Sequence, residues 1–149
     1  MMTPPATDTL ISALRVGADI ASISDVTSWL GAMAEKEDWP QAMRFGLELS
    51  LEEALTNVIS YGFHQVAHDP DIRVEVHRMP GGRVAVELID NGIAFDPTTI
   101  AEPEAVAAIE DARIGGHGVQ LMRHFLESLV YRREGNENRL TMVAAPAVQ

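Results

Sequence analysis

The order of hydrophobic patterns along the chain predicts an α+β fold, a two-layer α/β sandwich with helices on one face of a mixed, mainly antiparallel sheet. Three observations indicate this class. A short apolar strand is followed by two segments with helical spacing, a Pro-Gly-Gly turn joins two alternating segments, and a helix with a second hairpin closes the chain. The 149 residues suit a single domain, 1–149, and 46% of them are hydrophobic, enough to bury a core.

The first half of the chain predicts a tail, a strand and two helices. Residues 1–8 are rich in Pro and Thr and are expected to form a loose tail. Residues 10–16 predict the first strand. Residues 20–34 predict a helix, because their apolar side chains recur at helical spacing. After a polar connection, residues 41–61 predict a longer helix that Gly62 would end.

The second half predicts two hairpins separated by a loop and a helix. Alternating apolar and polar residues predict strands over 72–77 and 83–89, joined by the turn at 80–82. A long irregular stretch from 90 to 116, with a short helix expected around 104–111, is typical of a lid or binding loop. A helix over 119–126 and a closing hairpin of strands over 129–133 and 139–143 complete the prediction.

Composition excludes several classes of protein. The chain contains no cysteine, which excludes disulfides and thiolate metal sites. Its start lacks the features of a signal peptide, and no stretch approaches the roughly 18 apolar residues of a membrane span, so we expect a soluble, cytoplasmic protein. The net charge of −11 disfavours general binding of nucleic acid and favours basic partner surfaces, although by itself it is more typical of a solubility device.

The first segment with chemical potential lies on the second predicted helix. Glu53 and Asn57 are four residues apart, so their side chains share one helical face. An amide oxygen suits Mg²⁺, which prefers oxygen ligands, and a carboxylate is able to accept a hydroxyl proton. Taken alone, such a pair is more typical of a solvated polar face.

The second segment, residues 88–97, follows a predicted strand. The strand ends at Asp90, whose carboxylate suits an exocyclic amine such as that of adenine, and Gly92 permits a close approach to the backbone. Taken alone, Asp-Asn-Gly is more typical of a plain turn, with Phe95 in the core.

The third segment, residues 113–122, places glycines at the start of a helix. Backbone N–H groups and the positive end of the helix dipole suit phosphate there. Taken alone, the cluster is more typical of a flexible loop before a capped helix. His117 has no cysteine or carboxylate nearby at ligand spacing, which argues against a metal site.

Together, the order and spacing of these segments resemble the N box, G1 box and G2 box of the GHKL ATPases, which share the Bergerat ATP-binding fold. The boxes are Glu53-Ala54-Leu55-Thr56-Asn57, Asp90-Asn91-Gly92-Ile93-Ala94-Phe95-Asp96-Pro97 and Gly115-Gly116-His117-Gly118. Within that superfamily the chain most resembles the anti-sigma-factor serine/threonine kinases of RsbW type. The Phe-Asp-Pro extension and the domain-only length indicate this group, because sensor histidine kinases add a helical hairpin.

The resemblance implies a role for each matching residue. Asn57 would hold Mg²⁺, and Glu53 would be the general base for a serine or threonine hydroxyl. Asp90 would bind the adenine amino group, Gly92 would allow close approach, and Phe95 belongs to the same cofactor-binding group.

For the G2 box, the resemblance implies that Gly115, Gly116, His117 and Gly118 contact the ATP phosphates. Arg113 in the lid would face the γ-phosphate, although it also fits a solvated loop residue. The chain departs from the family pattern at Tyr61, where a His is common, and in lacking a Lys after the last strand.

The resemblance further implies a homodimeric partner-switching regulator. It would sequester a sigma factor and phosphorylate a STAS-type antagonist with Mg-ATP. Three alternatives remain open: a non-catalytic ATP-binding switch, a kinase whose client is not a sigma factor, and an interaction domain without nucleotide, which requires all three boxes to be coincidental.

Overall fold

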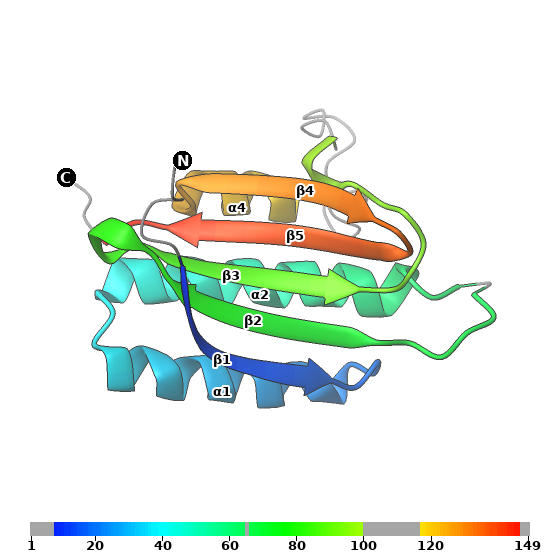
Figure 1. Ribbon diagram of the computed structural model, residues 1–149, viewed down its shortest axis with the longest axis horizontal. Coiled ribbons are helices and arrows are strands. Elements are labelled where there is room, and N and C mark those ends of the chain that lie inside the picture. The colour runs from blue at the N-terminus through cyan, green and yellow to red at the C-terminus, as the bar shows by residue number, and fades with distance from the viewer. Residues whose placement is uncertain (1–7, 65, 100–116, 147–149) are drawn as a thin grey trace, which may run out of the picture.

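The computed structural model describes residues 8–64, 66–99 and 117–146, which form one sheet and the helices packed on it (Figure 1). The sheet order is β1-β2-β3-β5-β4, and all four pairings are antiparallel. The predicted α+β sandwich is therefore confirmed, whereas the described strands contain no parallel pair and the sheet is not mixed. The strands are β1 (Thr9–Val16), β2 (Ile72–Arg78), β3 (Val84–Asp90), β4 (Ser128–Glu134) and β5 (Glu137–Ala144).

Three α-helices in the described part of the chain lie on the same face of the sheet (Figure 1). They are α1 (Ala21–Glu37), α2 (Gln41–Tyr61) and α4 (His117–Phe125). The second of these, α2, is central, because it contacts α1, α4, β3 and β5. As the sequence predicts, the helices form one layer and the strands form the other.

The ends of the elements follow local chemistry. The bounds predicted for α2 agree with the structure, and the Gly62 N–H caps the helix by donating to the Val58 carbonyl over 2.8 Å. The first helix, α1, continues three residues beyond the predicted end, until Asp38 adopts a left-handed conformation with φ of 60°. The turn between β2 and β3 depends on positive φ angles at Gly81 and Gly82, which glycine adopts without a steric penalty.

The core lies between the two layers. Inward-facing positions of the strands alternate with outward-facing ones, so Val74, Val76, Val86 and Leu88 all pack toward the helices. The helices contribute the fully buried side chains Leu30, Leu47, Leu51, Leu55 and Met122. The apolar spacing that predicted each helix is the spacing of these core residues.

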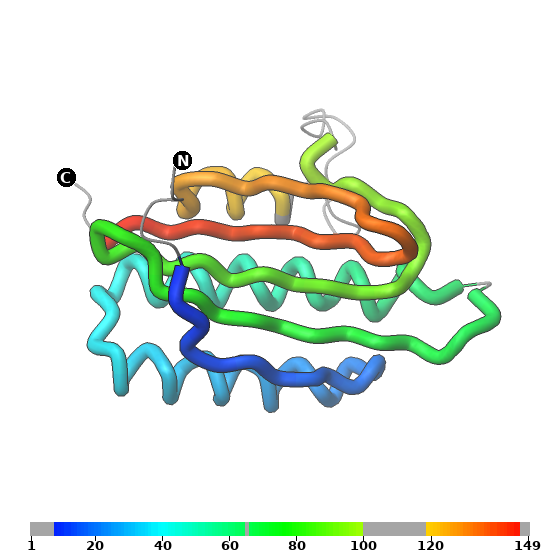
Figure 2. Tube along the Cα trace, in the orientation of Figure 1, coloured from blue at the N-terminus to red at the C-terminus, as the bar shows by residue number. Residues whose placement is uncertain are grey.

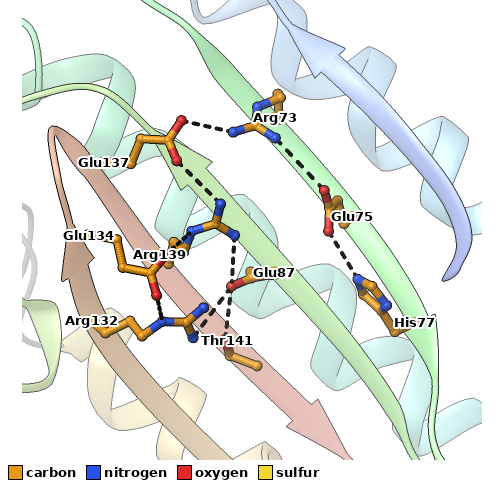
Figure 3. Close-up of polar contacts among 9 residues, drawn as sticks. All are labelled: Arg73, Glu75, His77, Glu87, Arg132, Glu134, Glu137, Arg139 and Thr141. Atoms are coloured by element: carbon orange, nitrogen blue, oxygen red, sulfur yellow. Dashed lines mark hydrogen bonds and ion pairs between the residues drawn. The ribbon is translucent and has the colours of Figure 1, made fainter. Parts of the chain in front are cut away.

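The other face of the sheet is covered by charged side chains (Figure 3). Arg73 of β2 bonds Glu137 of β5 at 2.9 Å, and Arg139 lies 3.5 Å from Glu87 of β3. Ile89 is opposite both arginines in the strand register and is only 1% exposed. Long arginine side chains shield apolar surface with their alkyl stems while their charged ends reach water.

One cluster on this face has the composition of a metal site. Within the described residues, the possible ligand atoms of Glu75, His77 and Glu87 lie within 4.8 Å of one another. However, Arg73 lies 3.8 Å from Glu75 and Arg139 lies 3.5 Å from Glu87, so positive charge already faces both carboxylates. The cluster is therefore part of the ion-pair network, and it gives no support to a cation site.

One end of the molecule brings together elements that are far apart in the sequence. The last turns of α2 and the end of β3 lie at the same end of the molecule, beside the β4–β5 turn (Figures 1 and 2). Among the described residues, no helix is long and apolar enough to span a membrane.

Candidate nucleotide-binding site

A cavity of about 340 Å³ lies between the C-terminal half of α2 and the ends of β3, β4 and β5. Its walls are mainly apolar, and they include Ala54, Val58, Leu88, Ile93, Phe95 and Leu140. Five polar side chains also line it: Asn57, Tyr61, Asp90, Tyr131 and Asn138. An apolar cavity with a few converging polar groups is typical of a small-molecule site.

Asp90 is the buried carboxylate of this cavity. It is the last residue of β3, faces the helix layer like Leu88, and is 4% exposed. Its Oδ1 accepts two hydrogen bonds, from the Gly92 backbone N–H at 2.8 Å and from Asn138 Nδ2 at 2.9 Å. Burial raises the pKa of Asp90 above its ordinary value, while the hydrogen bonds from Asn138 and Gly92 and the charge of Arg133 lower it.

Gly92 lies two residues after Asp90, and the structure explains the glycine at this position in a way that the sequence does not reveal. A Cβ on Gly92 would lie 2.5 Å from the Gly62 carbonyl oxygen at the end of α2 and 3.0 Å from Asp90 Oδ1. The next residue, Ile93, donates its N–H to the same Gly62 carbonyl at 2.9 Å. The close approach expected at Gly92 is thus an approach by the protein itself, and a contact between Gly92 and a ligand stays a prediction.

The two N-box residues differ in position. Asn57 lines the cavity together with Ala54, Val58 and Tyr61 of the same helix. Glu53 lies one turn before Asn57 and is half-buried, but it is not among the residues that line the cavity. The structure therefore places the predicted metal ligand in the cavity and the predicted general base beside it. Tyr61 also lines the cavity and is 48% exposed.

Phe95 also lies at the cavity and is 45% exposed. The alternative of a core position for Phe95 is therefore wrong. Its backbone N–H lies 3.4 Å from Asn138 Oδ1, which ties the loop after β3 to β5.

The residues of the G2 box are only partly placed. Arg113, Gly115 and Gly116 lie outside the described residues, as does the short helix expected at 104–111. His117 and Gly118 are the first two residues of α4. This helix begins two residues before the predicted start at Val119. A helix N-terminus presents unpaired N–H groups and a partial positive charge, so the backbone there suits an anion.

Sequence reasoning missed Asn138, which bonds Asp90, and the two side chains that bond Asn138, Tyr131 and Arg133. Asn138 bonds Asp90 through its amide nitrogen. The Oδ1 of Asn138 accepts hydrogen bonds from Tyr131 Oη at 2.6 Å and from Arg133 Nη1 at 3.1 Å. The available signal was strand alternation, because Asn138 occupies an inward-facing position two residues before the core residue Leu140. The predicted strand began at Arg139, one residue too late to include it.

A two-layer antiparallel sandwich with an apolar cavity and a buried acid at the end of a central strand is the arrangement of the Bergerat fold. The sequence agrees with this class over nearly its whole length. Residues 16–144 match the family described as the histidine kinase-like ATPase domain, and the chain belongs to that family.

Individual relatives indicate which proteins of this family the chain is similar to. The chain is 38% identical over 134 residues to the serine/threonine-protein kinase BtrW of Bordetella bronchiseptica, covering 90% of this chain and 93% of that protein. In fold, it is similar to the RsbU and RsbW domains of Rv1364c from Mycobacterium tuberculosis, with a TM-score of 0.64, 12% identity and coverage of 90% of this chain and 32% of that one. The predicted enzyme class, an ATP-dependent serine/threonine kinase, is confirmed at the level of family and relative.

The fold also occurs in a light-regulated kinase. The histidine kinase domain of the Erythrobacter litoralis EL346 blue-light-activated histidine kinase matches with a TM-score of 0.52 and 15% identity, over 85% of this chain and 60% of that one. At this level of identity the likeness shows the fold alone.

The residues of the cavity fit the ATP that the family implies. The apolar walls suit a planar base, and Asp90 offers it an acceptor oxygen. Asn57 supplies one oxygen of the kind that Mg²⁺ prefers.

Proposed function

We propose that the protein is a serine/threonine protein kinase that binds Mg-ATP in this cavity and acts in a partner-switching system. The observation that carries the proposal is the buried Asp90 carboxylate at the end of an apolar cavity that Asn57 also lines. The identity to a named serine/threonine-protein kinase over 90% of the chain supports the same activity.

In the proposed reaction, bound Mg-ATP supplies the phosphoryl group. Asp90 accepts a hydrogen bond from the base and so orients the nucleotide. Asn57 offers its amide oxygen to the metal ion. Glu53, one turn earlier on α2, would accept the proton of the attacking hydroxyl as the hydroxyl oxygen bonds to the γ-phosphorus, the bond to the β–γ bridging oxygen breaks and ADP leaves.

The proposed clients are a sigma factor, which the protein would sequester, and a STAS-type antagonist, which it would phosphorylate on Ser or Thr. A phosphoryl group adds about 1.5 to 2 negative charges at neutral pH. The kinase carries a net charge of −11, so phosphorylation would weaken the antagonist's hold on it. As the resemblance implies, the kinase would act as a homodimer.

A second candidate is a non-catalytic switch that holds ATP and exchanges partners by conformation. The position of Glu53 outside the cavity lining favours this candidate. A kinase requires that residue to reach a bound hydroxyl, whereas a switch does not.

Phosphotransfer distinguishes the two candidates. The protein is incubated with γ-labelled Mg-ATP and a lysate of its source cell, beside the variants Glu53→Gln and Glu52→Gln. Glu52 is the adjacent, exposed carboxylate and serves as the matched control. We expect one labelled protein on Ser or Thr, with labelling reduced about 10²-fold or more by Glu53→Gln and unchanged by Glu52→Gln. Full labelling by Glu53→Gln would exclude it as the base, and intact ATP binding without any labelling would favour the switch.

A further inference from the structure

The base-recognition end of the cavity contains a hydrogen-bond network that the proposed reaction does not use. It is centred on Asn138 of β5, which is 6% exposed. In the strand register, Asn138 faces Asp90 on one side and Arg133 on the other. This register places one amide between the acid of β3 and the edge strand β4 (Figure 1).

The partners of Asn138 fix which way its amide points. Its Oδ1 faces three donors: Tyr131 Oη at 2.6 Å, Arg133 Nη1 at 3.1 Å and the Phe95 N–H at 3.4 Å. Guanidinium and backbone N–H groups cannot accept hydrogen bonds, so only the amide oxygen fits on that side. Its Nδ2 faces two acceptors, Asp90 Oδ1 at 2.9 Å and the Ile93 carbonyl at 2.8 Å. A flipped amide would oppose like groups on both sides.

The fixed amide distinguishes the two oxygens of Asp90. Oδ1 accepts from both Asn138 Nδ2 and the Gly92 N–H. Oδ2 has no hydrogen-bond partner among the described residues, and Asp90 lines the cavity. One oxygen is therefore held by the protein, and the other remains for a ligand that donates a hydrogen bond.

We propose that Asn138, oriented by Tyr131 and Arg133, is a positioning residue for base selectivity, because it holds Asp90 as an ionised acceptor toward the base. The inference rests on the proposed nucleotide site. Position 6 carries an amino donor in adenine and a carbonyl acceptor in guanine, so an acceptor-only Oδ2 favours adenine. A protonated Asp90 would present a donor and lose this preference.

The charge state of Asp90 connects the network to selectivity. Burial raises the pKa of Asp90, and the Asn138 hydrogen bond is the largest influence that lowers it. Without that donor, Asp90 would hold its proton to a higher pH. The nucleotide-free protein should show this change, which a purely structural role of Asn138 would not produce.

Two measurements test the proposal on wild type and on Asn138→Leu, Tyr131→Phe and Thr141→Val. The first is the pKa of the Asp90 carboxyl group, which the NMR signal of its carboxyl carbon reports in nucleotide-free protein. The second is the ratio of ATP to GTP affinity, measured by calorimetry with Mg²⁺. Thr141 is the matched control, because it lies on the same strand with its side chain among the ion pairs of the opposite face (Figure 3).

We expect Asn138→Leu to raise the pKa of Asp90 and to lower the ATP-to-GTP ratio by about tenfold or more. Tyr131→Phe keeps the ring and removes one of three donors to Oδ1, so it should act in the same direction by about threefold. Thr141→Val should match the wild type. If Asn138→Leu does not fold, the changes in the Asp90 pKa and in the ATP-to-GTP affinity ratio of Tyr131→Phe test the proposal instead.

The outcomes separate this inference from the proposed function. Wild-type protein that binds neither nucleotide would overturn the proposed function and base selectivity with it. In the other case, the wild-type protein prefers ATP, and Asn138→Leu and Tyr131→Phe keep its ATP-to-GTP affinity ratio and its Asp90 pKa. This result would overturn the role of Asn138 alone.

Discussion

The carbonyl oxygen of Gly62 lies 2.5 Å from the point that a Cβ on Gly92 would occupy. Gly62 follows α2 and Gly92 follows β3, so this contact joins the helix layer to the sheet at the cavity. The Ile93 N–H donates to the same carbonyl at 2.9 Å, which fixes the contact by a hydrogen bond. The loop that carries Phe95 thus starts from a point with no space for a side chain.

Gly92→Ala should therefore destabilise the protein. The methyl group meets backbone rather than a flexible side chain, so the loop must move, at a cost of about 1–3 kcal/mol. For a domain of this size, that lowers the melting temperature by about 2–4 °C per kcal/mol. Thermal unfolding measures the change. Gly135→Asn is the control, since Gly135 has a φ of 60° and a Cβ there would meet nothing within 4 Å. Equal melting temperatures for both variants would contradict the argument.

Asp90→Asn should weaken ATP binding and reduce selectivity for adenine. The change replaces the acceptor oxygen at the cavity by a donor and removes one charge-assisted hydrogen bond, worth about 1.5–3 kcal/mol or about 10- to 100-fold in affinity. Calorimetric titration with ATP and GTP measures both effects. Asp25→Asn, on the exposed side of α1, is the control. An unchanged ratio of ATP to GTP affinity would exclude Asp90 from base recognition.

Asn57→Ala should remove the contribution of Mg²⁺ to nucleotide binding. Asn57 is the predicted metal ligand and lines the cavity, and alanine offers no oxygen there. ATP affinity is measured with Mg²⁺ and with a chelator, and the two values should converge in the variant. Thr56→Ala, at the preceding position, should keep the wild-type difference. A full Mg²⁺ effect in Asn57→Ala would place the metal ligand elsewhere.

The stability of the nucleotide-free protein should depend on the charge of Asp90. Its pKa is raised above 3.8 in the folded state, so folding favours the protonated form. The resulting stabilisation is fully present below 3.8 and is lost as the pH rises through the raised pKa. Asp90→Asn does not titrate, so its stability relative to wild type should increase with pH across this window. Urea unfolding at several pH values measures the difference; a constant difference would contradict a raised pKa.

Sequence patterns predicted the elements well where the signal is local. The bounds of α2 follow from helical spacing between Pro40 and Gly62, and the β2–β3 hairpin follows from strand alternation around Pro80-Gly81-Gly82. Asp90 was found for the same reason, since an acid ends an apolar strand and a glycine follows shortly after it.

Contacts between distant residues could not be predicted in this way. Asn138 meets Asp90 across 48 positions of sequence, and the pairing depends on the register of β3 with β5. Similarly, Gly92 is a glycine because of Gly62, which belongs to another layer. Periodicity reports which face a side chain takes, but not which residue it meets there.

The strand order has a consequence for how the cavity opens. Asp90 belongs to β3, which is paired on both sides. Tyr131 and Arg133 belong to β4, which among the described strands pairs only with β5 and so lies at an edge of the sheet. Edge strands exchange their amide hydrogens through local opening, at lower free energy than strands in the centre of a sheet. Local opening of β4 would free the Asn138 amide from Tyr131 and Arg133 while Asp90 stays in its strand. We therefore expect the orientation of the amide to be lost more often than the pairing of Asp90, which hydrogen exchange of β4 against β3 measures.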